Sequence, residues 1–511
     1  MKKILIILVI SATAFMSCKK FLEKEPDNRT KLDSPEKVAQ LLGSAYPQLN
    51  YQPMAELSTD NVDDLRTQDL AAPDWLRLTT DLYTYLDNTG TATSEDTPEG
   101  YWFACYRAIA ACNLAFQAID KIPAAEQKDY QAQKGEALVA RAYSHFMLVN
   151  FFSKFYNPAT AATDLGVPYV TEPEEVSIKK YDRKTVQYVY DMIEKDLQQG
   201  LPLIDDHVYK VPKYHFTRAA ANAFAARFYL HKKEMDSVIK YATAAIPESS
   251  IKNYLRPWNT EYTKLDLNGN GNLSQVYSKA TEPANMLLAE SRTWWLRLFG
   301  TGRYGISRDL SDYASGDAHI SNGSWAYRVV FYITGHNFIP KVDEYFVETS
   351  LGSGIGDGWQ MVTLLSSEEV LFNLAEAYAY KGQDQKAIDL LNTYLSTRIL
   401  SYNASAHNIS ASKIDAFYQA NPDMLKATPF KVVTPLTKGL INIILDYKQV
   451  EFAEEGLRWF DILRYGIVVG HNQYDENGNL QKTYTLDANN IHRVFQIPAT
   501  AMSQAGLPGN R

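Results

Sequence analysis

The sequence predicts a mostly α-helical fold, in which paired helices form the scaffold and a large irregular insertion, rich in loops, interrupts them. Apolar residues recur with a helical period over residues 101–120 and 130–155. Two further segments, 216–246 and 366–398, each have the pattern of two consecutive helices joined by a short turn. Residues 251–365 between them keep no helical period and are rich in Gly, Asn, Ser, Trp and Tyr.

The chain begins with the pattern of a secretory signal peptide. Lys2 and Lys3 precede an apolar run that is too short to span a bilayer, and mostly small residues lead to Ser17. Cys18 follows directly, which is typical of a lipoprotein signal, in which the cysteine becomes the acylated N-terminus. An ordinary secretory signal is the alternative, but with only three cysteines in the chain we favour lipidation. We therefore predict a signal peptide over 1–17 and a polar tether over 18–33.

Composition excludes some classes of protein. The formal net charge is −8, and removal of residues 1–17, which carry two lysines and no acid, lowers it to −10. This balance argues against nucleic acid as a partner, because phosphate binding needs a basic face. No later stretch has the long uncharged apolar run of a transmembrane helix. Cys105 and Cys112 are seven residues apart on a predicted helix, a rise of ~10.5 Å that exceeds the ~7 Å reach of a disulfide, so we expect both to be unpaired and buried.

Residues 34–250 form the predicted N-terminal helical region. Ser34 as N-cap, Pro35 at the first helical position and Glu36 in the first turn predict a helix that runs to about Tyr46. The alanine-rich helix over 130–155 offers a small-residue face that lets a neighbouring helix approach closely.

The segment 366–398 fits the register of a tetratricopeptide hairpin. The matching positions are Leu371, Leu374, Ala375, Tyr378, Gly382, Ala387 and Leu391. Gly382 is expected to cap the first helix. The segment 216–246 shares part of this pattern, but Lys233 stands where the glycine should be. A generic helical hairpin is the alternative. Because unrelated sequence separates the two segments, we predict tetratricopeptide-like hairpins and no regular solenoid.

Residues 251–365 are the predicted ligand-binding insertion, because long loops on a rigid scaffold usually carry binding function. Residues 266–272 begin like a calcium loop, but Tyr277 stands where the bidentate glutamate should be, so we favour a tight turn and expect no metal. Residues 352–358 are expected to form a flexible loop with no strand before it.

The predicted C-terminal region, 366–511, contains a charged segment over 447–466 that we expect to be one helix. Its apolar stripe consists of Val450, Ala453, Leu457, Phe460 and Leu463. Glu454 and Arg458, spaced i,i+4, and Asp461 and Arg464, spaced i,i+3, are expected to pair. Gly456 inside this helix indicates close backbone packing, and Gly466 suits the C-cap. We interpret these charges as structural and not as catalytic.

This segment resembles the signature of the SusD/RagB family, EL-x-x-EG-x-RWFDL-x-R-x-G. The matching residues are Glu451, Phe452, Glu455, Gly456, Arg458, Trp459, Phe460, Asp461, Ile462, Arg464 and Gly466. Other segments agree with the family in order, namely the cysteine-led start, 135–152, 166–170, 214–230, 374–392 and 497–510. The resemblance spans nearly the whole chain.

The resemblance implies a SusD-like α–α superhelix and a surface lipoprotein of Bacteroidetes. Such proteins are not enzymes; they bind glycans, or in some cases peptides, and cap a SusC-like TonB-dependent transporter in the outer membrane. The chain is therefore expected to be anchored in the outer membrane through Cys18, to face the cell exterior, and to need no cofactor. Its expected partners are an oligo- or polysaccharide and a SusC-like transporter.

Sugars present apolar C–H faces that stack on aromatic rings, and hydroxyls that bind amides, carboxylates and arginines. The family takes its ligand aromatics from one region in the N-terminal third and one in the middle of the chain. The candidates in these regions are Trp75, Tyr83, Trp325 and Tyr327, with Asn61, Arg77, Asp81 and Arg328 as hydrogen-bonding residues. For each aromatic, a position in the core is the alternative. Trp294, Trp295 and Trp459 are interpreted as packing residues.

Three other functions stay open. A peptide-binding transporter partner of the same family would differ only in its ligand. A surface glycoside hydrolase needs two carboxylates flanking a cleft, and acids are too common here to choose a pair. The G-x-S-x-G, H-E-x-x-H, Walker A and G-x-G-x-x-G motifs do not occur, and we predict no catalytic residues. A tetratricopeptide adaptor for protein partners would leave the loop aromatics unexplained.

Overall fold

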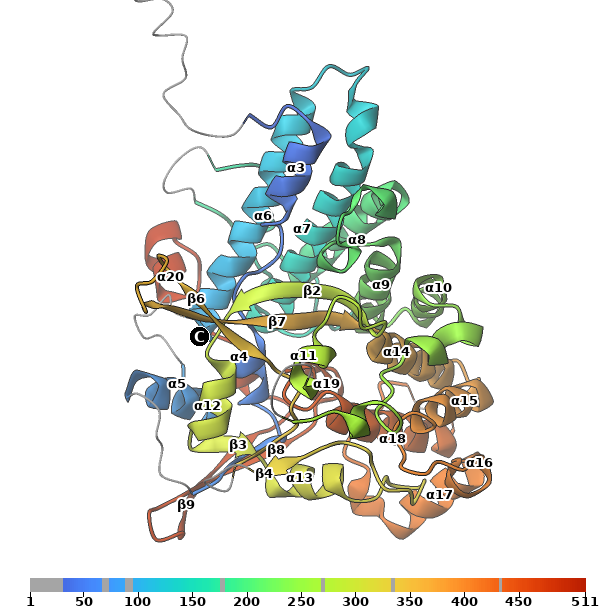
Figure 1. Cartoon of the computed structure of the whole chain (residues 1–511). Coiled ribbons are helices and arrows are strands. Elements are labelled where there is room, and N and C mark those ends of the chain that lie inside the picture. The colour runs from blue at the N-terminus through green and yellow to red at the C-terminus, as the bar shows by residue number, and fades with distance from the viewer. Residues whose placement is uncertain are drawn as a thin grey trace, which may run out of the picture.

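The computed structural model of the chain, shown in Figure 1, describes residues 31–66, 73–87, 95–174, 180–267, 272–331, 336–431 and 434–511. The predicted signal peptide and Cys18 lie outside the described residues. The predicted mostly α-helical fold is confirmed. The described helices, apart from short 3₁₀ turns, are α3 (Pro35–Leu42), α4 (Gln52–Glu56), α5 (Pro73–Tyr83), α6 (Pro98–Asp120), α7 (Gln131–Phe152), α8 (Val186–Gly200), α9 (Arg218–Lys232), α10 (Met235–Ala245), α11 (Leu273–Tyr277), α12 (Trp295–Thr301), α13 (Arg308–Ser315), α14 (Ser367–Tyr380), α15 (Asp384–Leu395), α16 (Ala404–His407), α17 (Ala411–Ala420), α18 (Pro435–Glu451), α19 (Arg458–Tyr465) and α20 (Ala499–Ala505).

Helices of the scaffold pack side by side into a curved row, most of them next to their neighbours in the chain (Figure 1). Helix α6 packs on α7, α7 on α8, α9 on α10, α10 on α14, and α14 on both α15 and α18. The predicted first helix begins after Ser34, whose side chain accepts a hydrogen bond from the backbone N–H of Lys37, but it ends at Leu42 and not near Tyr46. Cys105 and Cys112 on α6 are buried and unpaired, as predicted.

Both predicted helical hairpins are present. Helices α14 and α15 are joined at Gly382, whose φ of +69° is the left-handed conformation expected of a capping glycine. Helices α9 and α10 are joined at Lys233, which adopts the same conformation with φ of +66° although it carries a side chain. The backbone of the two hairpins is therefore alike at a position where their sequences differ.

The insertion contains more ordered strand than the sequence suggests. The described strands of the chain are β1 (Val62–Asp64), β2 (Asn285–Arg292), β3 (Tyr304–Ile306), β4 (Val330–Phe331), β5 (Asn337–Phe338), β6 (Glu344–Glu348), β7 (Gly356–Ser366), β8 (Val469–Tyr474) and β9 (Leu480–Leu486). Strands β2, β7 and β6 form an antiparallel sheet, and β7 leads directly into α14. The prediction that 352–358 has no strand before it is wrong, because β6 precedes this turn and β7 begins within it. Between positions 358 and 364, every second residue of β7 is buried, including Gln360, Val362 and Leu364. The glycines and polar residues of the strand make this two-residue period hard to recognise in the sequence.

The segment 447–466 is two helices, so the prediction of one continuous helix is wrong. Helix α18 ends at Glu451, α19 begins at Arg458, and Glu454 and Gly456 between them have φ of +71° and +72°. The backbone N–H groups of Glu454 and Gly456 donate to the buried carboxylate of Glu56 at 2.8 and 2.9 Å. A Cβ on Gly456 would lie 3.0 Å from the Cβ of Ala55, which confirms close packing here.

The break between α18 and α19 changes the pairing of the charged side chains. Arg458 does not pair with Glu454; its guanidinium binds Asp60 through two hydrogen bonds of 2.8 Å. The predicted pair of Asp461 and Arg464 is confirmed at 3.1 Å. Gly466 caps α19 with φ of +62°, as expected.

A chain of alternating buried charges joins the insertion to the scaffold. Arg398 binds both carboxylate oxygens of Glu451, at 2.8 and 3.0 Å, and Glu368 at 2.9 Å. Glu368 in turn binds Arg256 at 2.7 Å. All four side chains are fully buried. A buried charge is costly unless it is paired. The four segments that carry these side chains therefore depend on one another for a stable fold.

The described residues contain no helix that is both long and apolar enough to cross a bilayer. No group of three or more His, Cys, Asp or Glu side chains in the described part of the chain is arranged to hold a metal ion. Residues 268–271 of the loop weighed above as a calcium site lie outside the described residues.

We predict that Gly456→Ala lowers the free energy of unfolding by about 3 kcal/mol, because it combines a left-handed backbone with a crowded Cβ position. Gly478→Ala is the matched control, since Gly478 has φ of +80° but nothing within 4 Å of the added Cβ. It should lose only about 1 kcal/mol. Guanidinium denaturation of both variants measures the difference, and equal losses would refute close packing as the reason for glycine at position 456.

Arg398→Met should lower the free energy of unfolding by about 3–5 kcal/mol, because it leaves the carboxylates of Glu451 and Glu368 buried without this partner. The control is Arg308→Met on α13, where the arginine side chain is 89% exposed and pairs with Asp312 at 3.5 Å. That change should stay within about 0.5 kcal/mol. Urea denaturation of the two variants tests this, and a loss below about 1 kcal/mol for Arg398→Met would contradict the assigned role.

Candidate functional site

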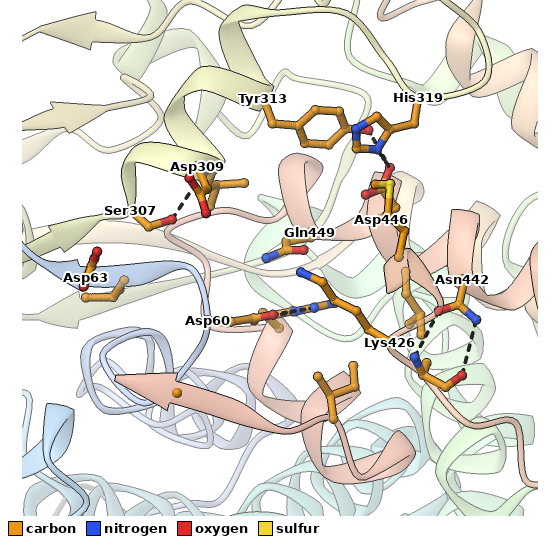
Figure 2. A pocket seen from close by; sticks show the side chains of 18 of the residues that line it. Asp60, Asp63, Ser307, Asp309, Tyr313, His319, Lys426, Asn442, Asp446 and Gln449 are labelled. Carbon is orange, nitrogen blue, oxygen red and sulfur yellow. Dashed lines mark hydrogen bonds and ion pairs between the residues drawn. The ribbon is translucent and has the colours of Figure 1, made fainter. Parts of the chain in front are cut away.

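A polar cleft of about 590 Å³ lies where α13, α17 and α18 meet the strands β1 and β8 (Figure 2). The charged and amide side chains that line it are Asp60, Asp63, Asp309, Asp312, His319, Lys426, Asn442, Asp446, Gln449, Arg458 and Asn472. Tyr313 and Tyr418 add aromatic surface. The cleft therefore combines acceptors, donors and rings in one hollow.

One wall of the cleft is a stacked pair of rings. Tyr313 on α13 and His319 lie with their ring centroids 4.2 Å apart and nearly parallel. The Tyr313 hydroxyl donates to Oδ2 of Asp446 at 2.6 Å, and Nδ1 of His319 lies 2.9 Å from the same oxygen. Figure 2 shows both rings beside Asp446, which holds them in place from α18. This wall is made from two segments far apart in the sequence.

The opposite wall carries an ion pair. Asp60 binds Arg458 through two hydrogen bonds of 2.8 Å. Burial opposes ionisation of Asp60, but the charge and hydrogen bonds of Arg458, with Lys426 nearby, hold the pKa of this carboxyl below its usual value. By contrast, burial raises the pKa of Asp63. Asp309 and Lys426 are exposed and have no ion-pair partner among the described residues, so both can bind a ligand.

Two of the residues predicted from the sequence support this cleft from behind. Asn61 is fully buried; its amide donates to Glu56 at 2.8 Å, and its Oδ1 accepts from Gln449 in the cleft at 2.9 Å. Tyr83 is also fully buried, and its hydroxyl lies 3.1 Å from Asp63. Its ring stacks on His471 at 4.1 Å. Both residues are placed to orient side chains of the cleft and not to touch a ligand.

Trp325 and Tyr327 are core residues in this structure. Trp325 is 2% exposed and packs edge-on against Tyr447 at 5.4 Å and Tyr313 at 6.0 Å, behind the ring wall. The Tyr327 hydroxyl lies 2.6 Å from that of Tyr394 and also binds Glu451. Their burial favours a packing role over a ligand-binding role for both aromatics.

The remaining candidates lie elsewhere. Arg77 is exposed and Asp81 half-buried, both on α5, and neither lines the cleft. Arg328 is half-buried and donates to the carbonyl of Leu265. The side chain of Trp75 lies outside the described residues, although its backbone belongs to α5. The described candidates therefore do not meet on one exposed surface, and a ligand role for Trp75 stays a prediction.

Sequence reasoning missed the residues that line the cleft, although one signal was present. Asn442, Asp446 and Gln449 recur at i, i+4 and i+7 on α18 and form a polar stripe along this helix. No sequence pattern indicates that Asp309 and Lys426 line the same cleft, because each lies in a segment distant in the sequence from α18.

Behind the cleft, Glu56 is a buried acid with several backbone donors. It binds Asn61 and the N–H groups of Glu454 and Gly456. Burial raises its pKa to about 7, although these hydrogen bonds act in the opposite direction. At neutral pH the fold therefore contains an acid close to its titration midpoint next to the cleft.

Comparison with known proteins gives two family matches. A SusD-like family model, described as starch-binding and associating with the outer membrane, matches residues 20–230. The model of the SusD family matches residues 368–504. None of the curated proteins matches the chain.

Solved structures with the same fold cover nearly the whole chain. A SusD superfamily protein from Bacteroides thetaiotaomicron is 18% identical and has a TM-score of 0.64, covering 94% of this chain and 100% of its own. A SusD-like carbohydrate binding protein from Bacteroides vulgatus is 17% identical with a TM-score of 0.60, covering 93% and 97%. A laminarin binding SusD-like protein is 16% identical with a TM-score of 0.61, covering 94% and 99%. At these identities the likeness shows the fold alone.

The raised pKa of Glu56 predicts a pH-dependent stability. The folded chain keeps this proton up to about pH 7, whereas an unfolded glutamate releases it near pH 4.5. Between these values the free energy of unfolding should fall as pH rises, by up to about 1.4 kcal/mol per pH unit for this group. Glu56→Gln cannot ionise, so it should flatten the decline measured by guanidinium denaturation at pH 5, 6 and 7.

The control for this experiment is Glu261→Gln, since Glu261 is exposed and, within the described part of the chain, pairs with Lys264 alone, at 3.2 Å. It should keep the slope of the unchanged protein. An identical slope for Glu56→Gln and the unchanged protein would show that Glu56 does not retain its proton in the folded state.

Proposed function

The chain belongs to the SusD family, and from that premise we propose that it is a cell-surface lipoprotein of the outer membrane that binds a glycan and delivers it to a SusC-like TonB-dependent transporter. The proposal assigns it a binding role and no catalysis. The laminarin binding and carbohydrate binding proteins that share its fold support a glycan as the class of ligand.

The observation that carries the proposal is the cleft between α13, α17, α18 and the strands β1 and β8. Its volume of about 590 Å³ suits a short oligosaccharide. Asp63 and Asp309 can accept hydrogen bonds from sugar hydroxyls, and Lys426 can donate to them. The half-buried ring of Tyr313 offers apolar surface for the C–H face of a sugar, with Tyr418 buried beneath the lining.

The start of the chain supports the membrane anchor. With Cys18 acylated, residues 18–33 would separate the lipid from α3, which begins at Pro35. Sixteen extended residues reach up to ~50 Å. Such a tether lets the folded part sit over a transporter while the lipid stays in the bilayer.

A peptide in place of a glycan is the second candidate within the family, because carboxylates and Lys426 suit a polar peptide as well as a sugar. Binding experiments distinguish the two. Hydrolysis of a bound saccharide would instead indicate a glycoside hydrolase and would contradict the proposal.

The test uses the soluble chain without the lipid-bearing cysteine, residues 19–511, and isothermal titration calorimetry with starch, laminarin, levan and mannan. We expect binding to one of them, and a loss of about tenfold for Asp309→Ala and for Lys426→Ala, because each removes a hydrogen bond to a charged group. Asp423→Ala is the control, since Asp423 is exposed near Lys426 but does not line the cleft.

Trp75→Ala separates the two candidate locations. Unchanged binding by this variant would agree with the cleft. Binding lost in Trp75→Ala and kept in Asp309→Ala and Lys426→Ala would move the site to α5 and contradict the cleft assignment. Binding of peptides and of none of the polysaccharides would replace the glycan with a peptide ligand.

A further inference from the structure

A second cleft, of about 670 Å³, shares no lining residue with the first and has a different charge. It lies between the segment that follows α7, the turn between α9 and α10, the end of α19 and the C-terminal segment. Its lining includes four cationic side chains, Lys154, Lys233, Arg464 and Arg493, and one carboxylate, Asp164. The chain as a whole has a net charge of −8, whereas the lining of this cleft has more cationic than acidic side chains.

Two of these cations are neutralised by the protein. Lys154 pairs with Asp164 at 2.8 Å, and Arg464 pairs with Asp461 at 3.1 Å and with Glu376. The other two are not. Among the described residues, Lys233 and Arg493 form no ion pair with a carboxylate; their contacts are the Phe430 ring and backbone carbonyls, respectively.

Arg493 is a buried cation that binds only neutral groups. It is 8% exposed, and its guanidinium donates to the backbone carbonyls of Asp487 at 2.6 Å and Ile462 at 2.8 Å. These carbonyls satisfy its hydrogen bonds, and the charge of Asp487 favours the guanidinium without forming an ion pair, so among the described residues it has no directly bound counter-charge. An anion in the cleft would supply one.

Arg183 repeats this arrangement behind the wall. It is 7% exposed and donates to the carbonyls of Gly166 at 2.6 Å and Pro508 at 2.8 Å, and to the side chain of Asn510, which lines the cleft, at 2.8 Å. Burial lowers its pKa to about 10. Two buried guanidinium groups without carboxylate partners therefore flank the same hollow.

Lys233 occupies a backbone position that favours glycine. Its φ is +66°, and the matching turn of the other hairpin carries Gly382. A side chain in this conformation costs energy that glycine would avoid. The Lys233 ammonium lies 4.5 Å from the centre of the Phe430 ring and has no acidic partner among the described residues. The contact with the Phe430 ring offsets part of this cost, and the side chain lies between this cleft and a neighbouring hollow that contains Phe430.

We propose that this cleft binds an acidic saccharide, with a carboxylate of the sugar beside Lys233 and Arg493. The exposed groups of Asn157, Thr160 and Asn489 in the same lining suit the sugar hydroxyls. The inference rests on the proposed glycan-binding function and adds a second place and a charged class of ligand to it.

The test is calorimetry on the full mature chain with hexagalacturonate in 50 mM NaCl. We expect binding that weakens as NaCl is raised, since salt screens the pairing of charges. Lys233→Gly removes the charge and relieves the backbone, so it should fold at least as stably as the unchanged protein but bind about tenfold more weakly. Lys128→Gln is the control, because Lys128 is exposed between α6 and α7 and does not line this cleft, so the change should leave binding unchanged.

Equal affinity of Lys233→Gly and the unchanged protein would overturn the assignment to this cleft. Displacement of hexagalacturonate by an equal concentration of sodium sulfate would show a general anion site and would overturn the saccharide as its ligand. Binding of a neutral polysaccharide without any binding of hexagalacturonate would overturn this inference and leave the proposed function intact. Binding of hexagalacturonate that Asp309→Ala leaves unchanged and Lys233→Gly weakens would support it.

Discussion

The buried chain of charges Arg256–Glu368–Arg398–Glu451 is the constraint on which the rest of the structure depends. Each member comes from a different part of the chain: the start of the insertion, helix α14, the segment after α15, and helix α18. Burial would raise the pKa of Glu451, but Arg398 holds it below its usual value. Because none of these charges can be buried alone without a large penalty, the insertion and the helical scaffold must assemble together.

The signature segment over 451–466 is explained by the same logic. Arg458 pairs with Asp60, Asp461 with Lys448, and Arg464 with Glu376. Glu455 binds Lys341 at 2.9 Å. Every charged group named here pairs with a side chain from another part of the chain. The motif is therefore explained by the fold and not by ligand binding. The groups free to meet a ligand, such as Asp309 and Lys426, lie outside it.

Features that depend on neighbouring residues, such as helix ends, can be predicted from the sequence. Features that depend on contacts between residues far apart in the chain cannot. Ser34 and Gly382 mark a helix start and a helix end by their own chemistry, and the structure confirms both. The break after Glu451 depends on Glu56, which is 398 residues from Glu454 and supplies the acceptor for its N–H. Trp325 looked like a loop aromatic, but two rings from other helices bury it. A core of this size absorbs aromatics from irregular segments, and no local pattern separates those from exposed ones.

Helix α19 contributes lining residues to both clefts, the polar cleft of the proposed function and the second cleft that contains Lys233 and Arg493. Arg458 at its start lines the polar cleft, and Arg464 near its end lines the cationic one. These positions are six residues apart, a rise of ~9 Å along the helix. Both arginines are occupied by acids of the protein, Asp60 on one side and Glu376 with Asp461 on the other. They build the walls, and the cleft charges that have no ion-pair partner among the described residues come from outside the motif. Asp309 and Lys426 set a mixed character in the first cleft, whereas Lys233 and Arg493 set a positive one in the second.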